Sequence, residues 1–393
     1  MSTAPKGFRF ATACAGFRKE GRADLALLVS DVPAVAAGTF TQNRFPAAPV
    51  LVAKAMLAER PAARAVMINS GQANACTGDE GMRNCRTTQE LVAGALGLEA
   101  SDILPASTGV IGAQLKMDLW EKAAPALAAN LGKATPEDFA KAIMTTDAFH
   151  KISHREVSLP GGVVKLVGMA KGAGMICPNM ATMLFITTDA AISRKALKAA
   201  LCADVEDTYN MISVDGDTST NDTLYGLANG ASGVSASDEE SLKALSAALT
   251  SVLGDLAYML VKDGEGASKV ARIHVTGAAS GADAERVART VGHSQLVKTA
   301  LYGRDANWGR IVAAVGRSGA DFNPDDVVVT LCGVELFRKG QPTDLDFDAL
   351  LEEPLKQRDL PIDIVLGSGS GSYTLLASDL GHEYVNVNAD YRS

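Results

Sequence analysis

The sequence predicts an α/β protein with two large or closely packed domains. Segments rich in Val, Ile, Leu and Thr alternate with segments of helical periodicity, which is typical of a mixed α/β fold. The 393 residues exceed the roughly 150 that serve as a prior for one domain. With 47% hydrophobic and 21% charged residues, the composition is that of a globular chain that folds throughout.

The first half of the chain alternates between the two kinds of segment. The expected elements are strands at 23–31 and 63–71, a helix over about 79–98, a strand with its loop at 102–112, and helices at 120–131 and 136–144. A hairpin follows, turning at Pro160, Gly161 and Gly162. It leads to residues 183–187, whose unbroken apolar sequence suits a strand covered on both faces.

The second half continues the pattern. Ser237 and Glu240 predict a capping box that opens a long helix with one stripe of leucines. The other expected elements are helices at 194–212, 284–302 and 308–315, a strand at 269–277, a hairpin at 327–340, and closing strands at 361–379 and 383–392. GSGSGS at 367–372 is interpreted as a hairpin turn, because a dinucleotide-binding loop would need a helix after it.

Charge and hydropathy exclude several classes of function. A net charge of -8 and a pI near 5.3 argue against nucleic-acid binding, which depends on concentrated Lys and Arg. The first thirty residues lack the apolar core of a signal peptide. The longest uncharged run, residues 172–188, is short for a membrane span and is interrupted by Pro178 and Asn179. We therefore expect a cytoplasmic protein without nucleic-acid or membrane partners.

No metal site is expected. The six cysteines lie far apart without a CxxC pair, so reduced and mostly buried thiols are the expectation. His150 and His154 have i,i+4 spacing, but no third ligand is evident, and both are interpreted as surface or hairpin histidines.

The stretch KGAGMICPNMATMLFITTDA, residues 171–190, places Thr182 between a Gly- and Pro-containing loop and a buried strand. No serine elbow or Cys/His pair is evident, which leaves a nucleophile whose general base is its own α-amino group. That amine exists only if the Ala181–Thr182 bond is cut. The Thr hydroxyl can attack the preceding carbonyl and form an ester that water opens. A freed α-amine has a pKa of about 7.7 to 8.0, where a general base is effective.

Simpler interpretations of these residues stay open at this point. A buried threonine at a strand start, satisfied by the backbone, explains the same stretch. The Ser107 and Thr108 hydroxyls and the Gly109 N–H could donate to an oxyanion, each worth about 10² to 10³ in rate, or could form an ordinary strand-to-helix turn. Polar loops that hint at a small-molecule site without defining it lie at 69–78, 145–147, 213–223, 262–269 and 302–310.

Six motifs taken together resemble one family. They are STGVIG (107–112), NSGQANACTG (69–78), KGAGMICPNMATML (171–184), DGEGASK (263–269), YGRDANWGR (302–310) and NADYRS (388–393). They are similar to those of the ornithine acetyltransferase (glutamate N-acetyltransferase, ArgJ) family of arginine biosynthesis, over essentially the whole chain. The resemblance implies two α/β domains with stacked mixed β-sheets flanked by helices, and a nucleophile at the domain junction.

The resemblance also implies roles for individual residues. The chain would cleave itself between Ala181 and Thr182 into an α chain (1–181) and a β chain (182–393), which stay associated as an α2β2 assembly. Thr182 would be the acetyl acceptor, and Thr108 and Gly109 the oxyanion hole. The substrate-binding set would be Thr145, Lys171, Thr182, Glu265, Asn388 and Ser393. Lys171 can meet a substrate carboxylate and Glu265 an ammonium group.

The implied reaction is a ping-pong transfer. Thr182 takes acetyl from N-acetylornithine, ornithine leaves, and glutamate accepts the acetyl group. No cofactor or metal is implied, although acetyl-CoA is a possible second acetyl donor. Two rival functions stay open: a self-cleaving Thr amidase or aminopeptidase, in which water attacks the acyl-threonine, and a non-catalytic amino-acid-binding protein with an intact chain.

Overall fold

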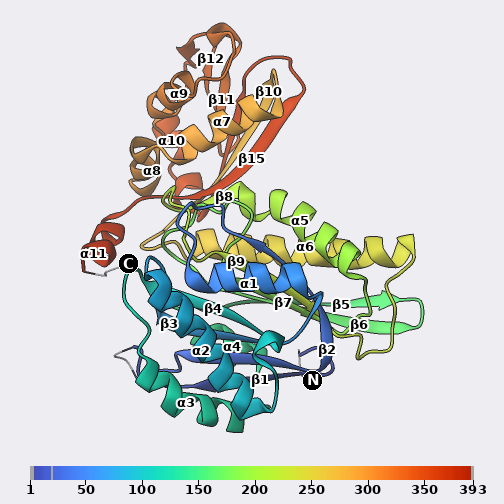
Figure 1. Ribbon diagram of the computed structural model, residues 1–393. Helices are drawn as coiled ribbons and strands as arrows, with labels where there is room; N and C mark the ends of the chain where they lie inside the picture. The colour runs from blue at the N-terminus through green and yellow to red at the C-terminus, as the bar shows by residue number, and fades with distance from the viewer. Residues whose placement is uncertain (1–3, 19–20, 391–393) are drawn as a thin grey trace.

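The computed structural model describes residues 4–18 and 21–390, and within them the chain forms two β-sheets flanked by helices (Figure 1). One sheet has eight strands and the other seven. Each contains parallel and antiparallel pairs. The prediction of an α/β protein with two mixed sheets is confirmed.

The first sheet takes strands from both sides of the Ala181–Thr182 bond. In order across the sheet they are β4 (Ile103–Val110), β3 (Ala62–Gln72), β2 (Leu25–Phe40), β9 (Thr223–Ala228), β7 (Leu184–Thr188), β6 (Gly162–Ala170) and β5 (Lys151–Leu159), with β1 (Phe8–Ala13) paired to β2. All five residues of β7 are buried, as its apolar sequence predicts. The predicted hairpin is formed by β5 and β6, with Leu159 paired to Gly162.

Helices cover both faces of the first sheet. They are α1 (Ala48–Glu59), α2 (Gly78–Leu96), α3 (Met117–Ala129), α4 (Pro136–Ala142), α5 (Arg194–Glu206) and α6 (Glu239–Lys262). Leu184 and Ile186 of β7 pack in one core with α5 and α6. Phe185 points to the opposite face, where its ring meets that of Phe139 in α4 with centroids 5.3 Å apart. The strand that follows Thr182 is therefore fixed from both sides.

The second sheet is formed mainly by the C-terminal third of the chain (Figure 1). In order it contains β13 (Gln341–Pro342), β12 (Val334–Arg338), β11 (Val328–Leu331), β14 (Asp359–Val365), β10 (Val270–Ala278), β15 (Gly371–Ser378) and β8 (Ile212–Ser213). The helices of this part are α7 (Gly281–Gly292), α8 (Gln295–Tyr302), α9 (Trp308–Gly316), α10 (Phe347–Leu351) and α11 (His382–Asp390). Short 3₁₀ helices are η1 (Ala100–Asp102), η2 (Tyr209–Met211), η3 (Pro324–Asp326) and η4 (Pro354–Lys356).

The Gly-rich segment 367–372 is not the predicted hairpin turn. β14 and β15 lie on opposite sides of β10, so their connection passes across the end of β10 instead of joining neighbours. A Cβ on Gly369 would lie 2.0 Å from the carbonyl oxygen of Ala278, and one on Gly371 would lie 2.3 Å from that of Ser280. The glycines are there because two backbones approach closely.

The prediction of a closing strand at 383–392 is wrong for the described part of that range. Residues 382–390 form α11, although Tyr and Val alternate with polar residues there. The helix contacts α8 and the turn after α6: His382 meets the ring of Tyr302 edge-on, and a Cβ on Gly266 would lie 2.7 Å from that of Glu383. Tertiary contact has overridden a local strand pattern.

Three smaller predictions also need correction. Asp238, rather than Ser237, caps α6, its carboxylate accepting from the backbone N–H of Ser241. The expected helical range 284–302 is two helices, and Ser294 caps the second. The thiols are free but not mostly buried, since only Cys85 is buried and two of the six cysteines are exposed.

α6 is long and apolar enough to cross a membrane by length and composition. Leu249, Val252 and Leu256 of α6 are buried in the core shared with α5 and the first sheet. Such burial is typical of the core helix of a folded domain.

We predict that Gly277→Ala destabilises the protein by about 2–4 kcal/mol. Gly277 has φ +71°, and a Cβ there would lie 2.2 Å from the carbonyl oxygen of Gly367 in the crossing segment. Gly316→Ala is the control, because a Cβ at Gly316 meets nothing within 4 Å. Thermal unfolding of both variants checks this, and equal midpoints would contradict the proposed close approach.

Candidate active site

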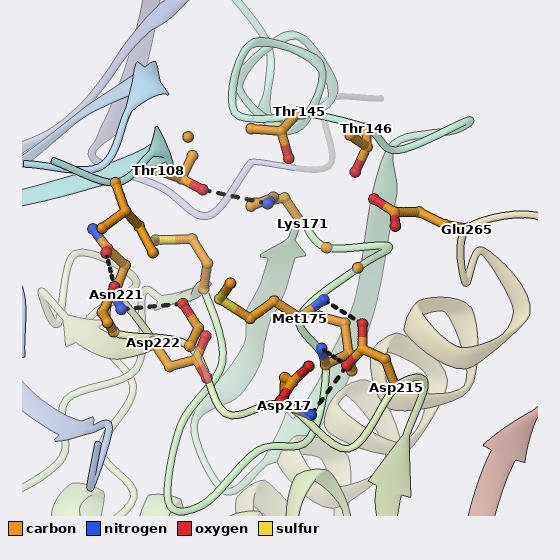
Figure 2. A pocket seen from close by; sticks show the side chains of 18 of the residues that line it. Thr108, Thr145, Thr146, Lys171, Met175, Asp215, Asp217, Asn221, Asp222 and Glu265 are labelled. Carbon is orange, nitrogen blue, oxygen red and sulfur yellow. Dashed lines mark hydrogen bonds between the residues drawn. The ribbon is translucent and has the colours of Figure 1, made fainter. Parts of the chain in front are cut away.

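A cavity of about 160 Å³ lies where several elements of the first sheet end, near the second sheet (Figure 2). Its walls come from the end of β4, the segment after α4, the segment after β6, the turn before β9, the turn after α6, and α11. These segments are far apart in sequence. Of the five polar loops noted in the sequence, those at 145–147, 213–223 and 262–269 line this cavity, whereas those at 69–78 and 302–310 do not.

Thr108 and Gly109 form one wall. Gly109 pairs with Gly71 of β3 and has φ +127°, and a Cβ on it would lie 2.3 Å from the carbonyl carbon of Gly71. Lys171 Nζ donates to Thr108 Oγ1 at 3.3 Å (Figure 2). Because an ammonium group can only donate, the Thr108 oxygen accepts and its own hydrogen is available to another acceptor.

Thr182 itself does not line this cavity, although the next residue, Met183, does. Thr182 is 1% exposed, and its carbonyl accepts from the N–H of Thr223 at 3.1 Å. Its hydroxyl has no hydrogen-bond partner among the residues that the structure describes. The interpretation of Thr182 as a threonine satisfied by its surroundings would need such a partner. A buried hydroxyl without one costs free energy of folding.

Tyr209 is the nearest candidate to interact with this hydroxyl. Its phenol is fully buried and also lacks a hydrogen bond of acceptable geometry within the described chain. Burial raises the pKa of Tyr209, and the neighbouring Thr182 hydroxyl acts in the opposite direction. The phenol is therefore neutral, and it lies beside the Thr182 hydroxyl without a hydrogen bond of acceptable geometry between them.

The segment before the Ala181–Thr182 bond is held in an unusual conformation. Met175 has φ +56° and Met180 has φ +70°, values that non-glycine residues rarely adopt. The Asp215 carboxylate accepts from the N–H of Met175 at 2.6 Å (Figure 2), and Asn210 Oδ1 accepts from the N–H of Met180 at 2.8 Å. Side chains that follow Thr182 in the sequence therefore hold the backbone before Thr182 in this strained conformation.

Carboxylates outnumber cations in the cavity. Asp215, Asp217, Asp222 and Glu265 line it together with Lys171. Burial raises the pKa of Asp222 to about 7, although the charge of Lys171 opposes the rise. Burial also lowers the pKa of Lys171. A ligand that carries ammonium groups as well as one carboxylate would complement these charges.

A buried ion network fixes three of the walls. Lys151 Nζ donates to Asp147 Oδ1 at 2.7 Å and to Asp263 Oδ2 at 2.5 Å, and its side chain is fully buried. The Asp147 carboxylate accepts from the N–H of Thr145 at 2.8 Å and from that of Gly172 at 2.6 Å. Although burial opposes it, the surrounding charges of Lys151 and Lys171 lower the pKa of Asp147. Burial raises the pKa of Asp263, and the charge of Lys151 opposes that rise. The network joins the loops after α4, β6 and α6.

Glu265 is positioned by its neighbours. Its N–H donates to the carbonyl of Ala173 at 3.0 Å, and Asn388 of α11 donates to its carboxylate at 2.6 Å. A Cβ on Gly174 would lie 2.5 Å from the Glu265 carboxylate, so a larger residue at this position would displace that carboxylate. Tyr384 of α11 completes this wall, and burial raises its pKa to about 12.

The structure brings most of the predicted site residues together. Those lining the cavity are Thr108, Gly109, Thr145, Lys171, Glu265 and Asn388. Ala181 is buried beside Thr182, and Ser393 lies outside the described residues. Sequence reasoning missed Lys151, whose i,i+4 spacing from Asp147 was the available signal, and Tyr384, which was assigned to a strand.

Fold and site define an α/β enzyme that acts on a small, charged molecule. The sequence model of the ArgJ family matches residues 9–393, and the chain belongs to this family.

Relatives match over nearly their full length. The chain is 69% identical over 394 residues to the arginine biosynthesis bifunctional protein ArgJ of Nitratidesulfovibrio vulgaris, covering 100% of both chains. It is 46% identical over 391 residues to the protein of that name from Geobacter sulfurreducens, covering 99% of both.

Solved structures match in part. ArgJ of Bacillus halodurans aligns with 36% identity and a TM-score of 0.49, covering 52% of this chain and 97% of that one. Ornithine acetyltransferase of Mycobacterium tuberculosis, complexed with ornithine, aligns with 38% identity and a TM-score of 0.41, covering 46% and 95%.

We predict that Lys151→Met destabilises the protein by about 3–5 kcal/mol at neutral pH, because it leaves two buried carboxylates without a cation. Without Lys151, the pKa of each carboxyl should rise above its unfolded value, so the variant should regain stability as the pH falls below 7. In the wild type the contribution of Asp147 is instead lost as the pH falls, since its pKa is lowered.

Lys141→Met is the matched control, since Lys141 also has a carboxylate four residues earlier, 2.7 Å away, but both side chains are about half exposed. Its loss should change stability little. The unfolding midpoints of both variants and of the wild type are measured between pH 5 and 8 and compared. Equal losses in the two variants would contradict the role assigned to the buried network.

Proposed function

We propose that this chain cuts its own Ala181–Thr182 bond and then uses Thr182 to transfer acetyl from N-acetylornithine to glutamate. The observation that carries the proposal is the buried Thr182 hydroxyl without a partner, beside a strained segment and a polar cavity. The names of the curated relatives, which refer to arginine biosynthesis and to two functions, support the same conclusion.

In the proposed cleavage, Thr182 Oγ attacks the carbonyl carbon of Ala181. The C–N bond breaks, the hydroxyl proton goes to the departing nitrogen, and water then hydrolyses the ester. The products are chains of 181 and 393 − 181 = 212 residues. They would remain together because β7 and β9 lie between strands of the first chain. We propose that two such pairs form an α2β2 assembly.

In the proposed transfer, the new α-amine of Thr182 takes the hydroxyl proton as Oγ attacks the acetyl carbon. The Thr108 hydroxyl and the Gly109 N–H stabilise the oxyanion, and the Lys171 contact leaves the Thr108 hydrogen free to donate. The proton passes to the leaving nitrogen, and ornithine departs. The amine of glutamate then attacks acetyl-Thr182 and restores the enzyme.

The charges of the cavity support these substrates. N-acetylornithine has one ammonium group and one carboxylate, and the ornithine that leaves has two ammonium groups and one carboxylate; both suit a cavity with several carboxylates and one lysine. Lys171 would bind the substrate carboxylate and Glu265 an ammonium group, with Thr145, Asn388 and Ser393 completing the site. The proposed chemistry uses the chain's own groups, without a cofactor. Acetyl-CoA would serve as the second acetyl donor.

We expect wild-type protein to give two chains and Thr182→Ala to remain one chain of 40.8 kDa without acetyl transfer. Thr187→Ala is the matched control, since Thr187 lies in β7, the strand that follows Thr182, is also buried, and also has a hydroxyl without a partner in the described chain. It should be cut normally. Intact-mass measurement distinguishes these outcomes, and an uncut wild-type chain would favour the non-catalytic binding protein.

A second experiment separates a transferase from an amidase. Incubated with N-acetylornithine, the enzyme should release ornithine continuously only when glutamate is present, because acetyl-Thr182 otherwise persists. Omission of glutamate should lower steady-state release at least tenfold after one turnover per site. Release that ignores glutamate would mean that water is the acceptor, as in the rival hydrolase.

A further inference from the structure

One buried side chain joins the two strand ends beside the proposed oxyanion donors. It belongs to Asn221, in the turn before β9, which is 5% exposed. Its amide nitrogen donates to the carbonyl of Ser107 at 2.7 Å and to that of Ala73 at 2.6 Å. Ser107 precedes Thr108 in β4, and Ala73 directly follows β3. Figure 2 shows Asn221 and Thr108 on the same side of the active-site cavity, which both of them line.

The neighbours of this amide determine its orientation and its use. The two carbonyl oxygens can only accept, so the amide nitrogen of Asn221, and not its oxygen, faces them. Asn221 Oδ1 in turn accepts from Thr220 Oγ1 at 2.7 Å. Both amide hydrogens are used inside the protein, and none is left to donate to a substrate. Asn221 can therefore hold other groups in place, although it lines the cavity.

The strand pairing is irregular at the place that Asn221 holds. β4 is the outermost strand of the first sheet, and among the described strands it pairs with β3 alone. The register shifts at Gln72, which pairs with both Thr108 and Val110. Gly109, with φ +127°, lies inside this irregular part. The regular ladder of backbone hydrogen bonds thus ends where the oxyanion donors lie, and another group has to fix them.

The residues after Asn221 also hold the nucleophile. Thr223, the first residue of β9, donates its N–H to the carbonyl of Thr182 at 3.1 Å. The Thr223 hydroxyl donates to the carbonyl of Asn221 at 2.9 Å. Residues 221–223 therefore hold Thr182 on one side and the carbonyl of Ser107 on the other. In a cut protein they would connect the nucleophile of one chain to the oxyanion donors of the other.

We propose that Asn221 is a positioning residue of the oxyanion hole. Its amide holds the Ser107–Thr108 peptide so that the Thr108 hydroxyl and the Gly109 N–H point at the acyl group that Thr182 attacks. Because a peptide unit is planar, fixing the Ser107 carbonyl also fixes the start of the Thr108 backbone. The inference rests on the proposed function, because it concerns the oxyanion of the acetyl transfer.

Asn221→Ala should lower kcat for acetyl transfer at least about tenfold, since each oxyanion donor is worth about 10² to 10³ in rate. The oxyanion forms only in the transition state, so kcat and kcat/KM for N-acetylornithine should fall by the same factor. Rates are expressed per chain of 212 residues, counted by intact mass, so that a change in the extent of self-cleavage does not enter the comparison.

Gln89→Ala is the matched control, because Gln89 of α2 anchors the opposite end of the same strand. Its Nε2 donates to the carbonyl of Ile103, the first residue of β4, at 2.7 Å, and Gln89 is 4% exposed. Both substitutions remove a buried amide that holds β4, so both should lower the unfolding temperature. Only Asn221→Ala should lower kcat, whereas a merely structural role of Asn221 would leave kcat per cut chain unchanged.

Amide hydrogen exchange gives a second readout that needs no reaction. The N–H of Ala73 donates to the carbonyl of Val110 at 2.9 Å and so joins the two strand ends that Asn221 holds. In the Thr182→Ala background, Asn221→Ala should make exchange of this N–H at least about tenfold faster, because the local opening costs less free energy. Gln89→Ala should change the rate less than about twofold.

Wild-type kcat in Asn221→Ala, or an equal loss of kcat in Gln89→Ala, would overturn the inference and leave the proposed function standing. If Asn221→Ala yields no cut chain, the exchange rate at Ala73 decides, and an unchanged rate would overturn the inference. A wild-type protein that transfers no acetyl group, with exchange at Ala73 still accelerated by Asn221→Ala, would contradict the proposed function while Asn221 still held the strand ends.

Discussion

The buried network of Asp147, Lys151 and Asp263 is the constraint on which the site depends. One lysine without solvent contact compensates two carboxylates, and each carboxylate holds backbone of a different loop. Such a network is costly to bury and strongly destabilising to break. Its value here is geometric, because it fixes the loops carrying Thr145, Lys171 and Glu265 relative to one another. The same network spans the Ala181–Thr182 bond, so it would hold the two halves of a cut chain in register.

Much of the fold follows from local sequence, and the exceptions share a cause. The central strand β7 is predictable because its residues are apolar on both faces, and the β5–β6 hairpin because Pro160, Gly161 and Gly162 favour a turn. α11 was not predictable, since an alternating pattern looks like a strand unless the packing on Tyr302 and Gly266 is known. The prediction of a hairpin turn at residues 367–372 was wrong for a similar reason. A hairpin turn and a connection that crosses the end of a strand have the same local composition.

The site was predictable where a motif carries a backbone requirement. Gly109 has φ +127°, and a Cβ there would collide with the backbone of Gly71, so this position of the motif favours glycine. The role of Lys151 was not predictable, because a lysine on a strand is usually solvated and its burial arises only when α6 ends at Asp263 beside it. The unpaired hydroxyl of Thr182 is likewise a property of packing. The motif singles out Thr182, and only the packing of the described residues shows that its hydroxyl has no hydrogen-bond partner.

The central claim is that Thr182, once it leads a new chain, carries the acetyl group. The most direct measurement is tandem mass spectrometry of enzyme quenched after mixing with N-acetylornithine in the absence of glutamate. The account predicts a chain of 212 residues that begins at Thr182 and bears one acetyl group on that side-chain oxygen, lost when glutamate is added before the quench. An acetyl group on another residue, or transfer by a chain that remains continuous through Thr182, would contradict it.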